Sequence, residues 1–281
     1  MEIVLLASGS TGNCALIKAG KGVDQVLVAL DCGIAQRTAR NFANDVLMPL
    51  TSVDAVLLSH AHSDHSKNVV AVAARANAPL FAHEDVPAQR HHTSASEIAR
   101  RKVEFKPFRA GHVFELGPLR VEPVALPHDS HPTHGFIFEA DGQKAGFFTD
   151  LGRPDPLMHG KLDGLHSLVL EFNYCPKMLA AGPYPPVLQD RISGGLGHIS
   201  NQEAASLLRE CCPPTLKHLT LAHLSKQNNR PHLAKEAAEK ALADIGRQDV
   251  IVRAAPPRGA RRAGPDLATN LPSKRVRLPR M

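Results

Sequence analysis

The sequence feature that most constrains the fold is a block of histidine and aspartate that follows an apolar run. Residues 53–60, VDAVLLSH, are apolar and β-branched and predict a buried strand that ends in polar residues. His60 and His62 are two residues apart at the end of this strand, so both imidazoles point to the same side. Asp64 and His65 follow in the turn that comes next. Because these four side chains within six residues are too many for one tetrahedral ion, they predict a site for two neighbouring ions. Imidazole combined with carboxylate favours Zn, Fe or Mn over Ca or Mg.

The rest of the chain alternates short apolar segments with helical ones, which predicts an α/β fold. The segments that predict strands are 2–8, 24–31, 53–60, 78–83, 119–126, 133–140, 144–150, 166–172, 216–223 and 249–254. The segments that predict helices are 67–77, 200–210, where Ser200 and Glu203 form a capping box, and 230–246. We expect 180–192 to be irregular and to flank a cleft. Many strands with helices between and around them predict two packed sheets covered by helices, in one domain over 1–254.

The positive charge of the chain is concentrated at its C-terminal end. The 281 residues carry a net charge of +6, and from Arg253 onward eight Lys or Arg face one acid, Asp266. This last stretch therefore carries +7 and the preceding 252 residues carry −1. Because Pro, Gly and Arg dominate 255–281 without an apolar period, we expect a disordered basic tail there. Such a tail is either an arm that binds nucleic-acid phosphates or a solubilising extension without a partner.

Several protein classes are excluded by what the sequence lacks. It has no run of 18 apolar residues, which excludes a membrane span, and its first residues lack the basic region of a signal peptide. The five cysteines include no CxxC pair, which argues against a disulfide scaffold or a zinc ribbon and for a reducing compartment. We therefore expect a cytoplasmic protein.

The block at 59–65 matches the HxHxDH signature of the metallo-β-lactamase superfamily, and the chain resembles that superfamily. The resemblance implies an αββα sandwich and a hydrolase with two divalent ions, zinc first and manganese or iron as alternatives. It also implies the ligands: His60, His62 and His128 for one ion, Asp64, His65 and His223 for the other, and Asp150 as the bridge. His131 and His134 compete with His128, which is preferred because Pro-His-Asp matches the third motif of the superfamily.

Further motifs resemble one branch of the superfamily, the YycJ/WalJ-type metallo-hydrolases, which are described as bacterial exonucleases. The motifs are SGSTGNC at 8–14, DCG at 31–33, FKPF at 105–108, EFN at 171–173, GHISN at 197–201 and HLSKQNN at 223–229. The resemblance covers about 1–245 and implies a phosphodiesterase that degrades DNA from the 5′ end. The chain departs from the branch at Tyr174-Cys175, where relatives usually have His-Asp.

Side chains around the expected centre are candidates for catalysis and substrate binding. Asp64 is expected to orient the attacking hydroxide or take its proton, and His198 is a candidate general acid or phosphate donor beside a helix N-terminus. The candidate substrate-binding residues are Ser10, Asn13, Ser200, Asn201, Ser225, Asn228 and Asn229. The 8–14 loop is equally well explained as a tight turn. The residues after His223 have a second interpretation, in which they hold that histidine in place. Asp31 is expected to orient a metal-binding loop.

Three functions are consistent with this pattern. The first is a metal-dependent phosphodiesterase that acts on nucleic acid, specifically a DNA exonuclease. The second is a small-molecule hydrolase on the same fold, either a cyclic phosphodiesterase or a thioester hydrolase. The third is a metal-binding protein without catalysis, which the full set of ligands disfavours.

Overall fold

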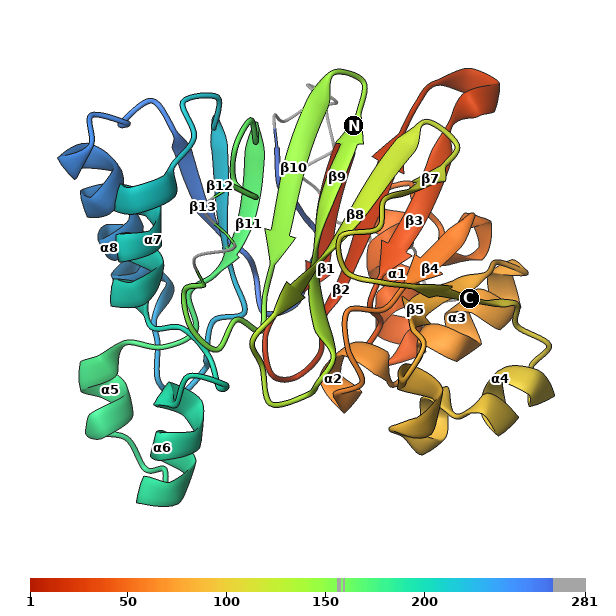
Figure 1. Ribbon diagram of the computed structural model, residues 1–281, viewed down its shortest axis with the longest axis horizontal. Coiled ribbons are helices and arrows are strands. Elements are labelled where there is room, and N and C mark those ends of the chain that lie inside the picture. Colours follow the sequence, from red (N-terminus) through yellow and green to blue (C-terminus); the bar gives the residue numbers. More distant parts are fainter. Residues whose placement is uncertain (156–157, 159, 265–281) are drawn as a thin grey trace, which may run out of the picture.

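Two seven-stranded sheets pack face to face in the computed structural model, which describes residues 1–155, 158 and 160–264 (Figure 1). The first sheet has the order β14-β1-β2-β3-β4-β5-β6 and the second β13-β12-β11-β10-β9-β8-β7. The strands of the first sheet are β1 (Glu2–Ala7), β2 (Cys14–Ala19), β3 (Val26–Leu30), β4 (Ala55–Leu57), β5 (Leu80–His83), β6 (Phe105–Phe108) and β14 (Arg261–Arg262). Those of the second are β7 (Phe114–Leu116), β8 (Leu119–Leu126), β9 (Thr133–Ala140), β10 (Gln143–Phe148), β11 (Ser167–Glu171), β12 (His218–Ala222) and β13 (Ile251–Ala254).

Both sheets contain a parallel half. Strands β3 to β6 run parallel to one another, as do β10 to β13, and the remaining pairs are antiparallel. Parallel strands bring their carboxyl ends to one edge of a sheet, which is where ligands bind in open α/β sheets. The topology therefore collects the residues that follow β4, β10, β11 and β12.

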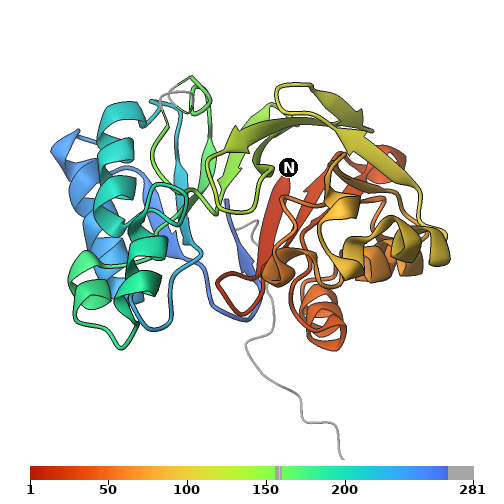
Figure 2. The same ribbon diagram turned by 60° about the horizontal axis from the view of Figure 1, so that its bottom comes forward.

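Helices cover the outer faces of both sheets (Figure 2). The described helices are α1 (Gln36–Asp45), α2 (Ser63–Ser66), α3 (Val69–Ala76), α4 (Ala95–Arg100), α5 (Pro176–Ala180), α6 (Pro186–Ser193), α7 (Asn201–Cys211) and α8 (Pro231–Asp244). Buried residues of α1, α3 and α4 pack on the first sheet, and those of α7 and α8 pack on the second. Among the described helices, none is both long and apolar enough to cross a membrane.

Central strands such as β1, β3 and β4 carry continuous apolar runs because both of their faces are buried. In β1, Ile3 and Leu5 join the core between the two sheets, while Val4 and Leu6 join the core under α1 and α3. The inner core also contains Phe136 from the second sheet. Strands buried on both faces are expected to be apolar throughout rather than alternating. The layers are thus helix, sheet, sheet and helix, which confirms the predicted αββα sandwich.

Local signals in the sequence predicted several elements correctly. Ser200 caps α7 by accepting a hydrogen bond from the Glu203 amide, and the Glu203 carboxylate accepts one from the Ser200 amide at 2.8 Å. The helix expected over 67–77 is confirmed as α3, and the short helix α2 precedes it. The segment 180–192, expected to be irregular, instead contains most of α6.

The boundary at 254 is wrong, because the chain continues into β14. Arg262 pairs with Val4 of β1, and the Ala263 amide donates to the Ile3 carbonyl at 2.8 Å. The Arg262 guanidinium also binds the carboxylate of Glu2. The first residues of the expected tail therefore belong to the first sheet. Residues 265–281, the remainder of the expected tail, lie outside the described part of the chain.

Candidate metal centre

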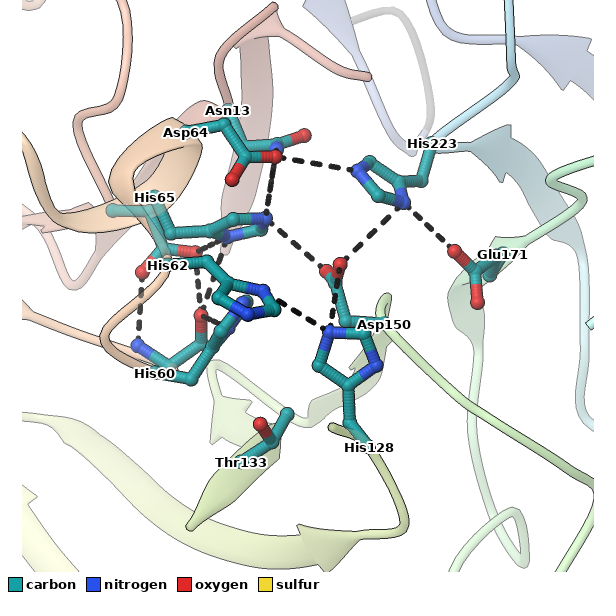
Figure 3. A network of polar contacts seen from close by, with 12 residues as sticks. Asn13, His60, His62, Asp64, His65, His128, Thr133, Asp150, Glu171 and His223 are labelled. Carbon is teal, nitrogen blue, oxygen red and sulfur yellow. Dashed lines mark hydrogen bonds and ion pairs between the residues drawn. The ribbon is translucent and has the colours of Figure 1, made fainter. Parts of the chain in front are cut away.

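Histidines and aspartates converge where strand ends from both sheets meet (Figure 3). His60 and His62 follow β4, and Asp64 and His65 lie on α2. The other three predicted ligands each follow a strand of the second sheet: His128 after β8, Asp150 after β10 and His223 after β12. The structure thus brings together all seven residues that the sequence predicted as ligands.

Three of the residues at these strand ends have left-handed backbone conformations. The φ angles are 57° at Asp31, 60° at Asp150 and 55° at His223. Non-glycine residues rarely adopt positive φ, and such strain persists where the surrounding structure enforces it, often at functional sites.

The first cluster consists of His60, His62 and His128, whose ring nitrogens lie within 4.8 Å of one another. The Nδ1 atom of His128 lies 2.9 Å from the Gly197 carbonyl oxygen, to which it donates a hydrogen bond. This bond leaves Nε2 of His128 facing His62, with 3.3 Å between Nε2 and the His62 Nδ1 atom. The structure favours His128 over both rival histidines. His134 instead stacks on His83, and the His131 carbonyl accepts a hydrogen bond from Gln89.

The second cluster consists of Asp64, His65 and His223, again with ligand atoms within 4.8 Å of one another. The Asp64 Oδ2 atom lies 3.7 Å from Nε2 of His65 and 3.8 Å from Nε2 of His223. Asp150 lies between the two clusters. Its Oδ2 atom is 3.2 Å from Nε2 of His65, and its Oδ1 atom is 3.8 Å from Nε2 of His128. This position is consistent with a bridging carboxylate.

A second layer of hydrogen bonds holds the second cluster from behind. Asp31 accepts from Nδ1 of His65 at 2.8 Å and from both the amide and the hydroxyl of Ser59 at 2.8 Å. The backbone of Gly33 lies against the backbone of Asp64. Glycine allows this contact, because a Cβ atom at position 33 would lie 1.6 Å from the Asp64 carbonyl oxygen. The DCG motif is thus explained by how it positions its neighbours, as the sequence led us to expect of Asp31.

Unpaired polar atoms at the centre of this arrangement fit divalent metal ions. At this centre, three of the buried side-chain atoms that lack a hydrogen-bond partner among the described residues are Nε2 of His60, Nε2 of His223 and Oδ2 of Asp150. Buried polar groups without partners are costly, so such atoms call for an explanation. Burial lowers the pKa of His60 well below its usual value, which keeps that imidazole neutral with a lone pair to donate. Nitrogen and carboxylate donors in this number match Zn, Fe or Mn.

Glu171 is a functional residue that the sequence reasoning did not assign. It ends β11 and is fully buried, and its Oε1 atom lies 2.7 Å from Nδ1 of His223 and 2.9 Å from Nδ1 of His198. Burial alone would raise the pKa of this carboxyl, but the two histidines lower it to about 2, with His198 contributing most. An acid at the end of the apolar run SLVLEF was the available signal.

A hollow of about 230 Å³ opens over the centre. Its lining is mostly ligand-type side chains together with residues of α6: Ser10, His62, Asp64, His128, Asp129, Asp150, Leu188, Arg191, Ile192, Gly197, His198 and His223. A larger cavity, of about 580 Å³, lies around Met1, Lys18 and Arg262, and no histidine lines it. We therefore assign the chemistry to the smaller hollow.

Of the predicted substrate-binding residues, only Ser10 lines this hollow. Asn13 is buried behind the second cluster. Its Nδ2 atom lies 2.8 Å from Nε2 of His65, and its Oδ1 atom accepts from the Gly9 amide at 2.9 Å. Asn13 therefore supports the cluster and the 8–14 loop. His198, the predicted catalytic histidine, does line the hollow.

The remaining five predicted substrate-binding residues do not line the hollow, and the side chains of all but Asn228 form hydrogen bonds within the protein. Ser200 caps α7, and the side chains of Asn201 and Asn229 bind each other at 2.9 and 3.0 Å. Ser225 accepts from the Asn228 amide at 3.1 Å, and Asn228 is buried. Hydroxyl and amide side chains satisfy backbone groups as readily as they bind ligands, which explains the difference.

The second interpretation of the segment after His223 is supported. Asn229 donates to the Asn173 carbonyl at 3.0 Å, and the Asn173 amide group donates to the His223 carbonyl at 2.8 Å. These bonds fix the backbone at His223. Tyr174, at the departure from the branch pattern, is 4% exposed and does not line the hollow.

Comparison with known proteins identifies the family. Residues 27–252 match the family model described as the beta-lactamase superfamily domain. The chain belongs to this superfamily. The predicted superfamily and the predicted class of metal-dependent hydrolase are thereby confirmed.

Two curated relatives of this superfamily protein resemble it over most of its length. It is 29% identical over 246 residues to exodeoxyribonuclease YycJ of Bacillus anthracis, covering 88% of this chain and 90% of that protein. It is 27% identical over 245 residues to exodeoxyribonuclease WalJ of Streptococcus pneumoniae, covering 86% and 89%. Among solved structures, the metallo-beta-lactamase fold protein YhfI from Bacillus subtilis matches with a TM-score of 0.68 and 15% identity, over 92% of this chain and 98% of that one.

Proposed function

We propose that this protein is a two-metal phosphodiesterase that degrades DNA from an end, in the 5′-to-3′ direction, in the cytoplasm. One observation carries the proposal: two ligand-type clusters joined by Asp150 lie at the base of a hollow that His198 also lines. The relatives named exodeoxyribonucleases support the choice of DNA, since the match covers about nine tenths of each.

The seven predicted ligands would hold two divalent ions, zinc in the first place and manganese or iron as alternatives. Such a pair lowers the pKa of a water molecule and stabilises the charge on phosphoryl oxygens. His60, His62 and His128 would hold one ion, and Asp64, His65 and His223 the other. Asp150 would bind both.

Asp64 is suited to act on the attacking water. Its side chain is 26% exposed and lines the hollow. Burial raises the pKa of this carboxyl, but the neighbouring His65 and His223 more than offset that effect and lower it. The carboxylate is therefore ionised at neutral pH and accepts a hydrogen bond, or a proton, from water in the hollow.

His198 is suited to protonate the leaving oxygen. Its Nδ1 atom is engaged with Glu171 at 2.9 Å, so Nε2 is the nitrogen available to a substrate in the hollow. A carboxylate behind an imidazole fixes the orientation of the ring. General acid catalysis of this kind contributes about 10²–10⁴-fold to the rate.

The test is a nuclease assay on the full chain loaded with Mn or Zn. End-labelled single- and double-stranded DNA are the substrates, with bis-p-nitrophenyl phosphate as the small ester. We expect mononucleotides to appear progressively from the 5′ end. Hydrolysis of the small ester without processing of any DNA would instead support the small-molecule hydrolase. Two bound metals without hydrolysis of either substrate would support the non-catalytic alternative.

A further inference from the structure

Arg191 of α6 stands at the mouth of the hollow. Among the described residues that line the hollow, it is the only Lys or Arg. Its side chain is 63% exposed, whereas Asp129, its partner, is 24% exposed. The remaining charged side chains of the lining are Asp64, Asp129 and Asp150, apart from the histidines. Arg191 is therefore the one permanent positive charge that this lining presents to an anion.

The ion pair with Asp129 orients the guanidinium of Arg191 but engages only some of its N–H donors. Nε of Arg191 lies 2.8 Å from Oδ2 of Asp129, and Nη2 lies 2.6 Å from the same oxygen. Both contacts thus end on one oxygen, although a guanidinium has five N–H donors in a fork that suits two oxygens. Ion pairs with a solvent-exposed partner contribute little to stability, so exchanging or sharing this partner costs little.

Asp129 also fixes how far the guanidinium is from the metal centre. Its other oxygen, Oδ1, lies 3.4 Å from Nε2 of His62 and 3.4 Å from Nε2 of His128. One carboxylate group therefore separates Arg191 from two atoms of the first cluster. A phosphate bound by Arg191 would be a neighbour of a phosphate held at the centre, rather than the same one.

Because the hollow is small, a long substrate must also contact residues outside it. At about 230 Å³ it is smaller than typical pockets for drug-sized ligands, which span about 300–1,000 Å³. A reacting phosphate and its nearest atoms fit inside, while the rest of a strand must lie on the rim. α6 forms part of that rim, below the ends of the sheets in Figure 1, and contributes Leu188, Arg191 and Ile192 to the lining.

We propose that Arg191 is a phosphate-binding residue that holds the phosphodiester group adjacent to the one being cleaved. This inference rests on the proposed function, because only a polynucleotide offers a second phosphate at that place. Arg191 then contributes to binding of the strand, and Asp129 positions it. Arginine is suited to this task because its planar fork binds phosphate oxygens bidentately.

The experiment compares Arg191→Gln and Arg191→Lys with Arg209→Gln. Arg209 is a matched control, since it lies on α7 outside the lining of the hollow and its Nε atom binds Asp244 of α8 at 2.9 Å. Binding of a fluorescent single-stranded oligonucleotide with cleavage-resistant phosphorothioate linkages is measured by anisotropy on the metal-loaded chain at several salt concentrations. We expect Arg191→Gln to weaken binding about tenfold and to reduce the salt slope by about 1. Arg191→Lys should fall between, and Arg209→Gln should match the unmodified chain.

Activity gives the second readout. On DNA, Arg191→Gln should lose kcat/KM mainly through KM, and at least about fivefold more than on bis-p-nitrophenyl phosphate, which has no second phosphodiester. Equal losses on both substrates, unchanged oligonucleotide binding, or no binding by the unmodified chain would each overturn the proposal. If the chain binds the oligonucleotide through Arg191 but does not cleave unmodified DNA with metal, the phosphate site stands and the proposed function fails.

Discussion

Nδ1 of His223 donates a hydrogen bond to Oε1 of Glu171 across 2.7 Å, and this bond fixes which nitrogen faces the metal centre. With Nδ1 protonated, the lone pair of His223 is on Nε2, the buried atom that has no partner among the described residues. Carboxylates that hold metal-binding histidines in this way set the tautomer and raise the basicity of the ring. The same oxygen of Glu171 holds His198, so one carboxylate orients both a predicted ligand and the predicted general acid.

Glu171→Gln should therefore weaken metal binding and slow catalysis together. A neutral amide does not stabilise the protonated Nδ1 of His223 as a carboxylate does, and outer partners of this kind contribute about 10–100-fold to affinity or activity. Metal affinity measured by competition with a chromophoric chelator checks the first effect. Glu139→Gln is the control, because Glu139 is exposed and paired with Arg120 at 3.0 Å. Unchanged metal affinity in Glu171→Gln would contradict the role we assign to this carboxylate.

His198→Gln should separate catalysis from metal binding. Because we place His198 as a proton donor and not among the seven ligands, the variant should keep two metals per chain. Its kcat should fall by about 10²–10⁴-fold, the contribution of a general acid. Metal analysis and kcat are measured on the same preparation, with His232→Gln on the exposed side of α8 as control. A variant that loses a metal would place His198 among the ligands instead.

The seven predicted ligands, which the structure brings together, could be named from sequence because they lie in motifs that resemble the superfamily, at or near the ends of predicted strands. The role of Glu171 could not, because it depends on the register between β11 and β12. Glu171 pairs with Ala222, which places its carboxylate beside the next residue, His223. No local pattern in the sequence shows which two parallel strands will lie next to each other in a sheet.

Long-range pairing also explains the missed strand β14. Its partner in β1 is at the other end of the chain, since Val4 pairs with Arg262. A segment of two strand residues surrounded by Pro, Gly and Arg has no local strand pattern of its own. The αββα sandwich was easier to predict, because its central strands are apolar on both faces and helices separate several of the strands.

His134 should make the stability of the metal-free protein sensitive to mild acid. The ring is 3% exposed, and burial first, then the adjacent His83, lowers its pKa from 6.5 to about 4. Below about pH 6.5 the unfolded chain therefore binds a proton at His134, whereas the folded chain binds that proton only near pH 4 and below. Stability from the neutral ring is complete above pH 6.5 and is lost as the pH falls to 4, by up to about 3 kcal/mol.

The measurement is urea unfolding in EDTA at pH 7, 6, 5 and 4.5, comparing the unmodified chain with His134→Leu. The variant removes the titrating group while keeping an apolar side chain against Phe108, so its unfolding free energy should fall less over this range. Parallel pH profiles for the two proteins would show that His134 does not carry this dependence.

Two truncations should separate the structural from the electrostatic contribution of the C-terminal end. A chain that stops at 264 keeps β14, including the Ala263–Ile3 backbone bond at 2.8 Å and the ion pair between Arg262 and Glu2. It lacks only 265–281, with four Lys or Arg and one Asp, and should unfold at the same urea concentration as the full chain.

DNA binding by the chain that stops at 264 should depend less steeply on salt, since each lost phosphate contact reduces the slope by about 0.7–0.9. A chain that stops at 254 loses the β14 contacts as well and should be less stable by roughly 1–3 kcal/mol. If the 264 chain keeps the full salt slope, residues 265–281 do not contact DNA, and the solubilising interpretation of that segment holds.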